Sequence, residues 1–599
     1  MKVLLIAVNS KYIHSTPAIY LIKAFAENQF ADIGSGCSDP DLPENKFAGI
    51  GNGCSNPDLP EIDTAEYSIN QQPFDVLSDI YSRRSDLIIF SCYIWNIEFI
   101  KKLALSLRLL LPETPFWAGG PEVSYDCDVF LRENPAFTGL IKGEGEISDT
   151  ELIEHYCMRS PSLSEIKGLV YRTKDGNIEE TPRRPLMDMD RLPFIYNEEN
   201  IAFWKNKIIY YESSRGCPFS CSYCLSSVDK SVRFRSFDLV AGELKFFLAH
   251  NVRQVKFIDR TFNIKAEHCI KIFRFIKEHD NGLTNFHFEI SGDILSEEMI
   301  SIIEGMRPGL IQLEIGVQTT NPETIKAIRR KTDLKALKDH VSRIHSFNNT
   351  HCHLDLIAGL PYEDLESFRK SFNDVYALRP EDLQLGFLKV LKGAPIRSDI
   401  KEHDIKYSPL PPYEVLSTKY LDFDSVVCLK KIEQMTELYY NSAQFSQTLK
   451  YLEREFVSAF DMFKELSDFY DAHGCFSNSP SRLHRYDILL AFAESKGLNS
   501  AFYAQLLTFD LYLREHLKSR PGFAMDIKAF YQEIKTIERL SLLTPAADIH
   551  IEPFTYDLTS PDAADKPLKE PVFILFDYKK RSALTHNCSF RVISQETKG

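Results

Sequence analysis

The sequence predicts an α/β protein in three parts: a doubly wound (Rossmann-like) domain over residues 1–180, a central partial (β/α)6 barrel like a TIM barrel over 201–404, and a mainly helical C-terminal domain over 405–599. Short apolar runs alternate with stretches of helical period in the first two parts, the pattern of βα units. The proline-rich stretch TPRRPLMDMDRLPF indicates a linker over 181–200. Longer helical patterns dominate after residue 405.

The N-terminal part repeats a strand-then-helix unit. KVLLIA at 3–8 is an apolar run typical of a buried strand, and a helical stretch follows near Ser15 to Glu27. Further strands are expected at Glu66–Asn70, Asp86–Cys92, Pro115–Ala118 and Gly139–Lys142, with a small strand pair near Gly168–Arg172. In such a sheet, ligands bind where the parallel strands end.

An internal repeat interrupts this pattern over residues 31–63. IGSGCSDPDLPE is followed by IGNGCSNPDLPE, and Gly, Pro, Asn and Asp are residues of turns. We therefore expect a surface loop. Metal binding by Cys37 and Cys54 is the alternative, but two thiolates fill only half of a tetrahedral site.

The central part contains six strand-like runs, each followed by a helical pattern. They end at Ser213, Asp259, Ser291, Gln318, Gly359 and about Lys389. Six such units predict a partial barrel whose working face lies at the carboxyl ends of its strands. The C-terminal part, which ends in the strand-rich PVFILFDYKK and CSFRVIS, carries no chemical motif, and we expect it to pack against the barrel and shape a substrate entrance.

Composition limits the partners and the compartment. A formal net charge of -14 and a pI near 5.7 argue against a general nucleic-acid binder. No apolar run approaches the ~20 residues that cross a bilayer, and the N-terminus lacks a signal-peptide cleavage pattern. Thirteen scattered cysteines do not resemble a secreted disulfide framework, so a cytoplasmic location is expected.

The strongest motif is RGCPFSCSYC, which follows the strand KIIYYESS. It places Cys217, Cys221 and Cys224 in CxxxCxxC spacing within one loop. Thiolates are the usual ligands of iron-sulfur clusters, and three without an obvious fourth fit a 4Fe-4S cluster that leaves one iron open. Structural zinc is the alternative, but it normally takes four protein ligands.

This motif, its preceding strand and the βα repeats after it resemble the radical SAM (S-adenosylmethionine) superfamily over about residues 200–400. The resemblance implies that the open iron binds SAM and that reductive cleavage gives a 5′-deoxyadenosyl radical, with an electron donor such as flavodoxin or ferredoxin. It assigns no catalytic residue beyond the cluster. The SAM contacts that it implies are Tyr223, Asp259 in FIDRTFN, Glu314 and Gln318 in LEIGVQTTN, and Gly359 in DLIAGLPYED with Asp355 and Glu363.

Two points in that assignment stay open. Arg260 stands where relatives often have a second acid, which leaves that acid without a counterpart here. For Glu314 and Gln318, ordinary solvation or helix capping is the alternative to a contact with the SAM ribose.

The N-terminal part resembles the cobalamin-binding domain of cobalamin-dependent radical SAM proteins. Glycines after two successive strands allow a large flat ligand to approach the backbone. The residues implied are Asn9, Ser91, Gly119, Gly120, Pro121, Glu122, Gly143 and Gly145, with His14 and Cys92 on the same face. No DxHxxG motif is present, so cobalamin is expected to bind without a protein imidazole on cobalt, or the domain has lost it.

Together these resemblances imply a radical SAM enzyme in which cobalamin takes part in methyl transfer, cyclisation or rearrangement on an unidentified substrate. The C-terminal part resembles the uncharacterised domain found on some of these proteins. Two other functions stay open: a radical SAM enzyme whose N-terminal domain binds substrate or RNA, and an iron-sulfur electron carrier or redox sensor.

Overall fold

The computed structural model describes residues 1–35, 59–541, 548–558 and 567–593. The chain divides into two compact units. Unit 1 comprises residues 1–289, 328–331 and 389–416, and unit 2 comprises 290–327, 332–388 and 417–599.

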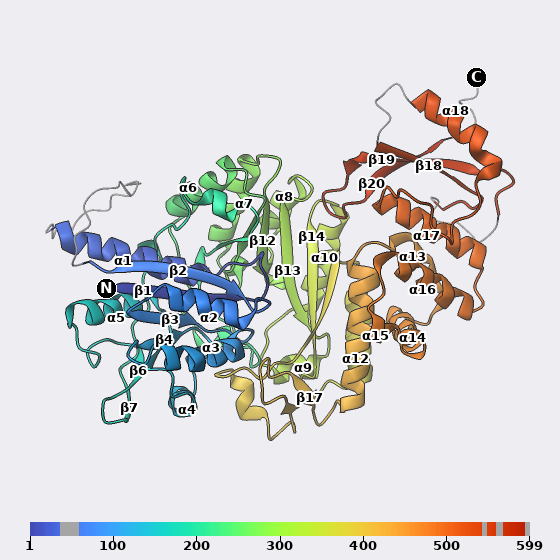
Figure 1. Cartoon of the computed structure of the whole chain (residues 1–599). Helices are drawn as coiled ribbons and strands as arrows, with labels where there is room; N and C mark the ends of the chain where they lie inside the picture. Colours follow the sequence, from blue (N-terminus) through green and yellow to red (C-terminus); the bar gives the residue numbers. More distant parts are fainter. Residues whose placement is uncertain (36–58, 542–547, 559–566, 594–599) are drawn as a thin grey trace. The chain divides into compact units, whose positions relative to one another are not determined.

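Unit 1 opens with a seven-stranded sheet in the order β2-β1-β3-β4-β5-β6-β7 (Figure 1). Its parallel strands are β1 (Lys2–Asn9), β2 (Glu61–Ser68), β3 (Leu87–Ser91), β4 (Phe116–Gly119) and β5 (Gly139–Ile141). The strand pair β6 (Leu169–Arg172) and β7 (Ile178–Glu180) extends the sheet in antiparallel fashion. The intervening helices are α1 (Pro17–Ser35), α2 (Pro73–Ser82), α3 (Ile97–Leu110), α4 (Cys127–Glu133) and α5 (Glu146–Met158).

Both faces of this sheet are buried, which confirms the doubly wound prediction. Along β1, Leu4 belongs to an apolar cluster with residues of α2, α3 and α4, whereas Leu5 belongs to a second cluster with residues of α1 and α5. Successive side chains of a strand point to opposite faces, so an uninterrupted apolar run such as KVLLIA serves both clusters.

The predicted loop over residues 31–63 is too long at both ends. Helix α1 continues to Ser35, and β2 begins at Glu61 rather than at the expected Glu66. Ile62 and Ala65 are buried in register beside β1, while the intervening acidic residues kept this edge strand from standing out in the sequence. Cys37 and Cys54 lie outside the described residues.

The first half of the barrel also belongs to unit 1. Strands β8 (Ile209–Tyr211), β11 (Gln254–Phe257) and β12 (Asn285–Ile290, whose last residue belongs to unit 2) pair in parallel, and α6 (Phe237–Ala249) and α7 (Ala266–Glu278) connect them. A short antiparallel ladder of β9 (Ser214–Arg215) and β10 (Arg233–Phe234) follows β8. Short 3-10 turns are η1 (Met189–Arg191), η2 (Ile201–Trp204), η3 (Leu225–Val228), η4 (Phe262–Ile264) and η6 (Pro395–Asp399).

Unit 2 contains the second half of the barrel. Strands β13 (Ile311–Gln318), β14 (His351–Ala358) and β15 (Asp382–Phe387) pair in parallel. Their helices are α8 (Glu297–Glu304), α9 (Pro322–Ala327), α10 (Leu334–Ser346) and α11 (Leu365–Tyr376). All six strands expected for the partial barrel are thus present, three in each unit.

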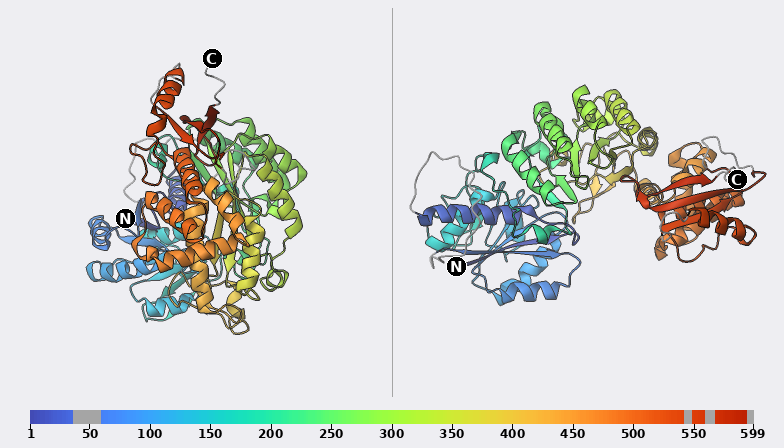
Figure 2. Two further views of the ribbon diagram at one scale, coloured as in Figure 1. Left: turned by 90° about the vertical axis from the view of Figure 1, so that its right-hand side faces the viewer. Right: turned by 90° about the horizontal axis from the view of Figure 1, so that it is seen from above.

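The rest of unit 2 is mainly helical, as predicted (Figure 2). Its helices are α12 (Phe423–Met435), the π-helix η7 (Thr436–Asn441), α13 (Ser446–Leu452), α14 (Ala459–Ala472), α15 (Cys475–Asn478), α16 (Arg482–Ser495), α17 (Ser500–Arg514) and α18 (Tyr531–Ser541). The helical patterns after residue 405 form several separate helices. Helix α14, for example, starts anew at Ser458, whose side chain accepts a hydrogen bond from the Asp461 amide.

Unit 2 ends in an antiparallel sheet of β18 (Ile549–Phe554), β19 (Val572–Arg581) and β20 (Cys588–Ile593). The sequence predicted the last two strands but not β18. Across the described ranges, no helix combines the length and the apolar character needed to span a membrane.

Candidate functional site

The three motif cysteines lie in one loop of unit 1, between β9 and η3. Cys217 and Cys221 are buried and Cys224 is half-buried. The Cys217 amide donates to the Asp229 carbonyl at 3.1 Å, and its Sγ lies 3.5 Å from Thr261 Oγ1. These two contacts therefore hold the start of the loop in place, next to β9.

Gly216, directly before the first cysteine, is required by the fold. Its φ is +101°, and an added Cβ would lie 2.2 Å from the Ser231 carbonyl oxygen. Only glycine allows the β9 and β10 backbones to approach this closely in that conformation. The glycine of the RGC motif thus sets the direction in which the cysteine loop leaves the strand.

The three cysteines lie in one loop, but their side chains do not converge on a common point. Within the described ranges, no group of three or more His, Cys, Asp or Glu side chains could hold a metal ion as placed. The donor set nevertheless fits a 4Fe-4S cluster, because three soft thiol ligands come from one loop.

Arg330 is a residue of this site that the sequence did not indicate. Its Nη1 donates to the Tyr223 hydroxyl at 3.1 Å, and its side chain also hydrogen-bonds Cys221. Burial raises the pKa of the Cys221 thiol, and the guanidinium opposes that rise. In sequence, Arg330 is one of several basic residues at the end of a helical pattern, so no signal distinguishes it from a solvated side chain.

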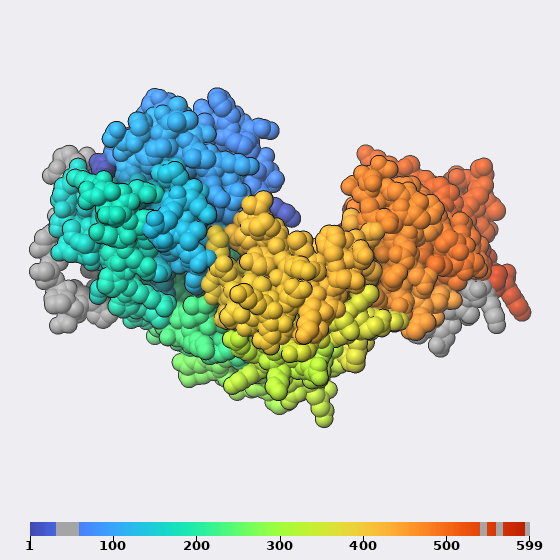
Figure 3. All heavy atoms as spheres, turned by 90° about the horizontal axis from the view of Figure 1, so that it is seen from below, coloured from blue at the N-terminus to red at the C-terminus, as the bar shows by residue number. Residues whose placement is uncertain are grey.

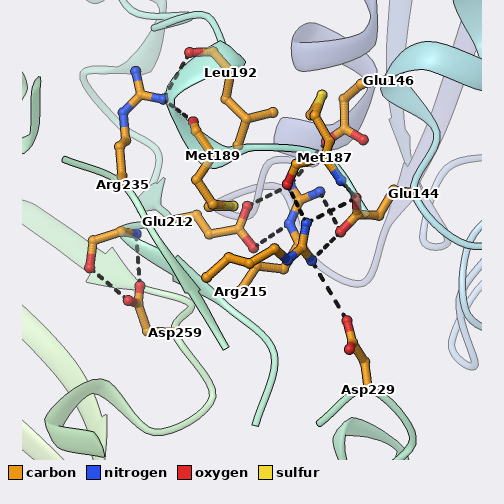
Figure 4. A network of polar contacts seen from close by, with 12 residues as sticks. Glu144, Glu146, Met187, Met189, Leu192, Glu212, Arg215, Asp229, Arg235 and Asp259 are labelled. Carbon is orange, nitrogen blue, oxygen red and sulfur yellow. Dashed lines mark hydrogen bonds and ion pairs between the residues drawn. The ribbon is translucent and has the colours of Figure 1, made fainter. Parts of the chain in front are cut away.

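Asp259 lies in unit 1 but is fully buried. Its carboxylate accepts hydrogen bonds from the Ser213 amide at 2.9 Å, the Ser213 hydroxyl at 2.6 Å and the Ser214 hydroxyl at 2.5 Å. Burial raises the pKa of Asp259 to about 7, against the effect of these hydrogen bonds. The side chain therefore holds the strand that leads into the cysteine loop (Figure 4).

The other SAM candidates belong to unit 2. Glu314 lies within β13, so it caps no helix, and Gln318 ends that strand with φ of +72° after a shift in register. The Oε1 atom of Gln318 is buried and has no hydrogen-bond partner among the described residues. Gly359 follows β14 with φ of +85°. Gln318 and Gly359 thus lie at the carboxyl ends of β13 and β14, whereas Glu314 lies in the middle of β13.

His353 is a second residue that the sequence did not indicate. It pairs in register with Glu314 on β13 and Asp382 on β15. Its Nε2 lies 2.9 Å from Asp355 Oδ1, and its Nδ1 lies 3.8 Å from Asp382 Oδ2. Desolvation lowers the pKa of His353, but these acidic neighbours outweigh it and raise the pKa to about 9.

The four candidate glycines of the N-terminal sheet have different environments. A Cβ at Gly120, where φ is +106°, would lie 2.5 Å from the Cys92 carbonyl oxygen, and one at Gly145 would lie 2.5 Å from Asp149 Oδ2. A Cβ at Gly119 would make only ordinary contacts. Gly143 differs, since its φ is +90° and an added Cβ would meet no atom within 4 Å. Gly120 and Gly145 are therefore explained by the protein's own packing, and Gly143 alone faces open space.

Several other candidates are engaged within the protein. Glu122, which follows Pro121, is buried, forms an ion pair with Lys392 Nζ at 2.8 Å and accepts a hydrogen bond from Tyr413. This carboxylate ties residues 389–416 to the N-terminal sheet, beside which they lie in Figure 3. Asn9 Oδ1 accepts a hydrogen bond from Thr16 at 2.7 Å, and His14 Nδ1 lies 2.6 Å from the Tyr210 hydroxyl.

The loop after β3 supplies an aromatic surface that the sequence analysis missed. Trp95 is 44% exposed and stacks on Tyr93 with a centroid distance of 4.4 Å. Its Nε1 donates to the Val8 carbonyl at 3.2 Å. Asn96 Nδ2 donates to the same carbonyl and to the Ser91 carbonyl. Trp95, exposed and anchored on the less exposed Tyr93 at a strand-end edge, suits a large planar ligand.

Family models match three successive parts of the chain: "B12 binding domain" over residues 3–153, "Radical SAM superfamily" over 211–375 and "Protein of unknown function (DUF4080)" over 401–576.

Curated relatives match at low identity. The cobalamin-dependent radical SAM methyltransferase TokK of Streptomyces tokunonensis is 25% identical over 352 residues, which is 55% of this chain and 50% of that protein. The 2-(S-pantetheinyl)-carbapenam-3-carboxylate methyltransferase of Streptantibioticus cattleyicolor is 24% identical over 53% of this chain and 48% of that protein. The chain spans about half the length of these relatives.

Solved structures share the fold. The cobalamin-dependent S-adenosylmethionine radical enzyme OxsB, with aqua-cobalamin and S-adenosylmethionine bound, matches with a TM-score of 0.57 at 12% identity, over 91% of this chain and 81% of that one. The radical S-adenosylmethionine methyltransferase TsrM from Kitasatospora setae, with cobalamin and a [4Fe-4S] cluster, matches with a TM-score of 0.53 at 15% identity, over 67% of this chain and 74% of that one.

Proposed function

We propose that this chain, which belongs to the radical SAM proteins that carry a B12-binding domain, is an enzyme that uses SAM and cobalamin to transfer a methyl group to a carbon atom of an unidentified substrate. One observation carries the proposal: unit 1 holds both a loop of three thiols after β9 and an open glycine, Gly143, at a strand end of a doubly wound sheet. The methyltransferase names of several relatives favour methyl transfer over rearrangement.

The cofactor ligands follow from the donor types. Cys217, Cys221 and Cys224 would hold the 4Fe-4S cluster, and Tyr223, Glu314, Gln318 and Gly359 are the proposed SAM contacts. When bound, the cluster supplies the electron that cleaves SAM, and the corrinoid carries the methyl group. A small reductant of the ferredoxin or flavodoxin type is the proposed electron donor.

The chain's own residues position these groups. Asp259 fixes Ser213 and Ser214 at the entry to the cysteine loop, and we assign it this positioning role instead of a direct contact with SAM. The proposed cobalamin face includes Gly143 and the Tyr93–Trp95 pair. His14 lies in no DxHxxG motif, and we propose that the corrinoid binds without an imidazole from this loop. We propose the domain boundaries 1–180, 201–404 and 405–599.

Anaerobic reconstitution of the whole protein tests the proposal. We expect about four iron atoms per chain, bound corrinoid and formation of 5′-deoxyadenosine from SAM under reducing conditions. A protein with a full cluster that does not cleave SAM would point to an electron carrier. Cleavage of SAM without any bound corrinoid would favour a radical SAM enzyme whose N-terminal domain binds substrate.

A further inference from the structure

The loop that follows β5 contains a glycine with open space beside it and acidic side chains that form ion pairs. An added Cβ at Gly143 would meet no described atom within 4 Å. The neighbouring Glu146 reaches Arg215 of β9 (Figure 4), and Glu144 reaches Arg233 of β10. The proposed corrinoid loop is thus tied to the strand pair from which the cysteine loop departs.

Arg215 makes the most direct connection, because it lies two residues before Cys217. Its Nη2 donates to Glu146 Oε1 at 2.9 Å and to Glu212 Oε2 at 2.7 Å, and its Nη1 lies 3.3 Å from Glu144 Oε1. The Arg215 side chain is 19% exposed and that of Glu146 is 8% exposed. This arginine therefore joins carboxylates of the N-terminal sheet to one from the barrel in a nearly buried position.

Arg233 makes a parallel connection. It pairs in register with Arg215, and its Nη1 donates to Glu144 Oε2 at 3.2 Å. It also lies 3.6 Å from Asp229 Oδ2, and the Asp229 carbonyl is the group that accepts the Cys217 amide. An unbroken chain of contacts runs from the loop of Gly143 to the first cysteine.

The charges in this network do not balance. Four carboxylates, those of Glu144, Glu146, Glu212 and Asp229, face the guanidinium groups of Arg215 and Arg233. Asp149 is the next acidic group beside Glu146, and burial raises its pKa to about 8, so this carboxyl group adds little negative charge at neutral pH. Removing Arg215 would take away the cation that Glu146 and Glu212 share, whereas Glu144 would keep Arg233.

Such an arrangement is a poor source of stability. Burying charges costs desolvation energy that the ion pairs recover only in part. A network of directed contacts does, however, fix the geometry between the loop after β5 and the β9–β10 ladder.

We propose that Arg215 is a positioning residue that couples corrinoid binding at the loop of Gly143 to occupation of the cysteine loop by its cluster. The inference rests on the proposed function, since it concerns the same two cofactors. Energetic coupling between two sites typically changes affinity by about 5- to 150-fold. The cluster-loaded chain should bind corrinoid more tightly than the iron-free chain by a factor in this range.

The test uses the full chain, titrated with hydroxocobalamin and followed by absorbance, in the cluster-loaded and the iron-free form. Wild-type protein should show the affinity ratio given above, and Arg215→Gln should lower that ratio clearly toward 1, because only the connection through Arg233 would remain. Arg184→Gln is the matched control. It removes the same charge from a guanidinium that pairs with Glu151 of α5. Within the described residues Arg184 forms no ion pair with the carboxylates that contact Arg215, so the variant should keep the wild-type ratio.

A milder variant guards against misfolding of Arg215→Gln. Glu146→Gln leaves Arg215 its contacts with Glu212 and Glu144, and we expect it to lower the ratio while the cluster still assembles. In the double variant, the ratio should equal that of Arg215→Gln alone, since both changes break one connection.

Three outcomes would overturn the inference. These are an unchanged ratio in both single variants, an equal loss in Arg184→Gln, and a wild-type chain that binds corrinoid with the same affinity in both forms. The last result would leave the proposed function standing. A wild-type chain that binds no corrinoid in either form would remove the cobalamin part of that function as well.

Discussion

Arg330 donates a hydrogen bond to the hydroxyl of Tyr223 at 3.1 Å and also hydrogen-bonds Cys221, so one half-buried cation contacts two residues of the cysteine loop. Hydrogen bonds to cluster sulfurs are among the factors that set the reduction potential of an iron-sulfur centre. This contact suggests that the chain tunes its cluster from outside the CxxxCxxC motif.

Replacing Arg330 by Gln should therefore lower the reduction potential of the cluster. A positively charged donor stabilises the more negative reduced state, and a hydrogen bond to a charged group is worth about 1.5–3 kcal/mol, which for one electron corresponds to roughly 60–130 mV. Potentiometric titration followed by electron paramagnetic resonance measures the shift. Arg329→Gln is the control, because Arg329 pairs with Asp399 at the surface. An equal potential in both variants would contradict this role.

Each of Cys217→Ala, Cys221→Ala and Cys224→Ala should lose the cluster, since a methyl group cannot replace a thiolate ligand. Iron content and visible absorbance after reconstitution are the measurements. Cys269→Ala and Cys352→Ala should retain both, because these thiols are buried in helix α7 and strand β14. A single motif variant with wild-type iron would refute the assignment.

Gly143 and Gly120 should respond differently to substitution. Gly143→Val should reduce corrinoid affinity by at least about tenfold, or about 1.4 kcal/mol, because its side chain would occupy the space that Gly143 leaves open. The positive φ adds strain, so thermal unfolding is followed in parallel. Gly120→Ala should instead lower the melting temperature, because its Cβ would collide with the Cys92 carbonyl. Unchanged corrinoid binding by a folded Gly143→Val protein would rule out Gly143 as part of the binding face.

His14→Ala should leave the absorbance spectrum of bound corrinoid unchanged. Loss of an imidazole ligand would alter the spectrum, but His14 lies in no DxHxxG motif, and its Nδ1 lies 2.6 Å from the Tyr210 hydroxyl. Tyr210→Phe, which removes that partner, serves as the comparison. A spectral change in His14→Ala alone would identify His14 as a cobalt ligand.

His353 should make the stability of the chain depend on pH. Its pKa is raised to about 9 in the folded state from an ordinary value of 6.5. The stabilisation from its charged form is therefore fully present below about pH 6.5 and is lost as the pH rises to about 9, an effect of up to about 3 kcal/mol. The fall in melting temperature between these pH values should be smaller in His353→Gln than in the wild type. The same fall in both proteins would exclude His353 as its cause.

The sequence alone determined the fold class and predicts the cluster ligands, because both depend on local patterns. Apolar runs such as KVLLIA mark strands buried on both faces, and the cysteine spacing places three thiols in one loop wherever that loop lies. Edge strand β2 escaped prediction in part, since its acidic residues break the apolar pattern.

Only the tertiary structure decided which candidate side chains are available to a ligand and which additional residues surround the cofactor loops. Asp259 and Glu122 carry suitable chemistry in the sequence, yet the fold commits them to Ser213 and Lys392. Arg330 approaches Cys221 from a position 109 residues further along the chain, and Arg215 approaches Glu146 from 69 residues away. Contacts over such separations arise when strands and loops pack together, and no short-range pattern encodes which charged side chain will meet which partner.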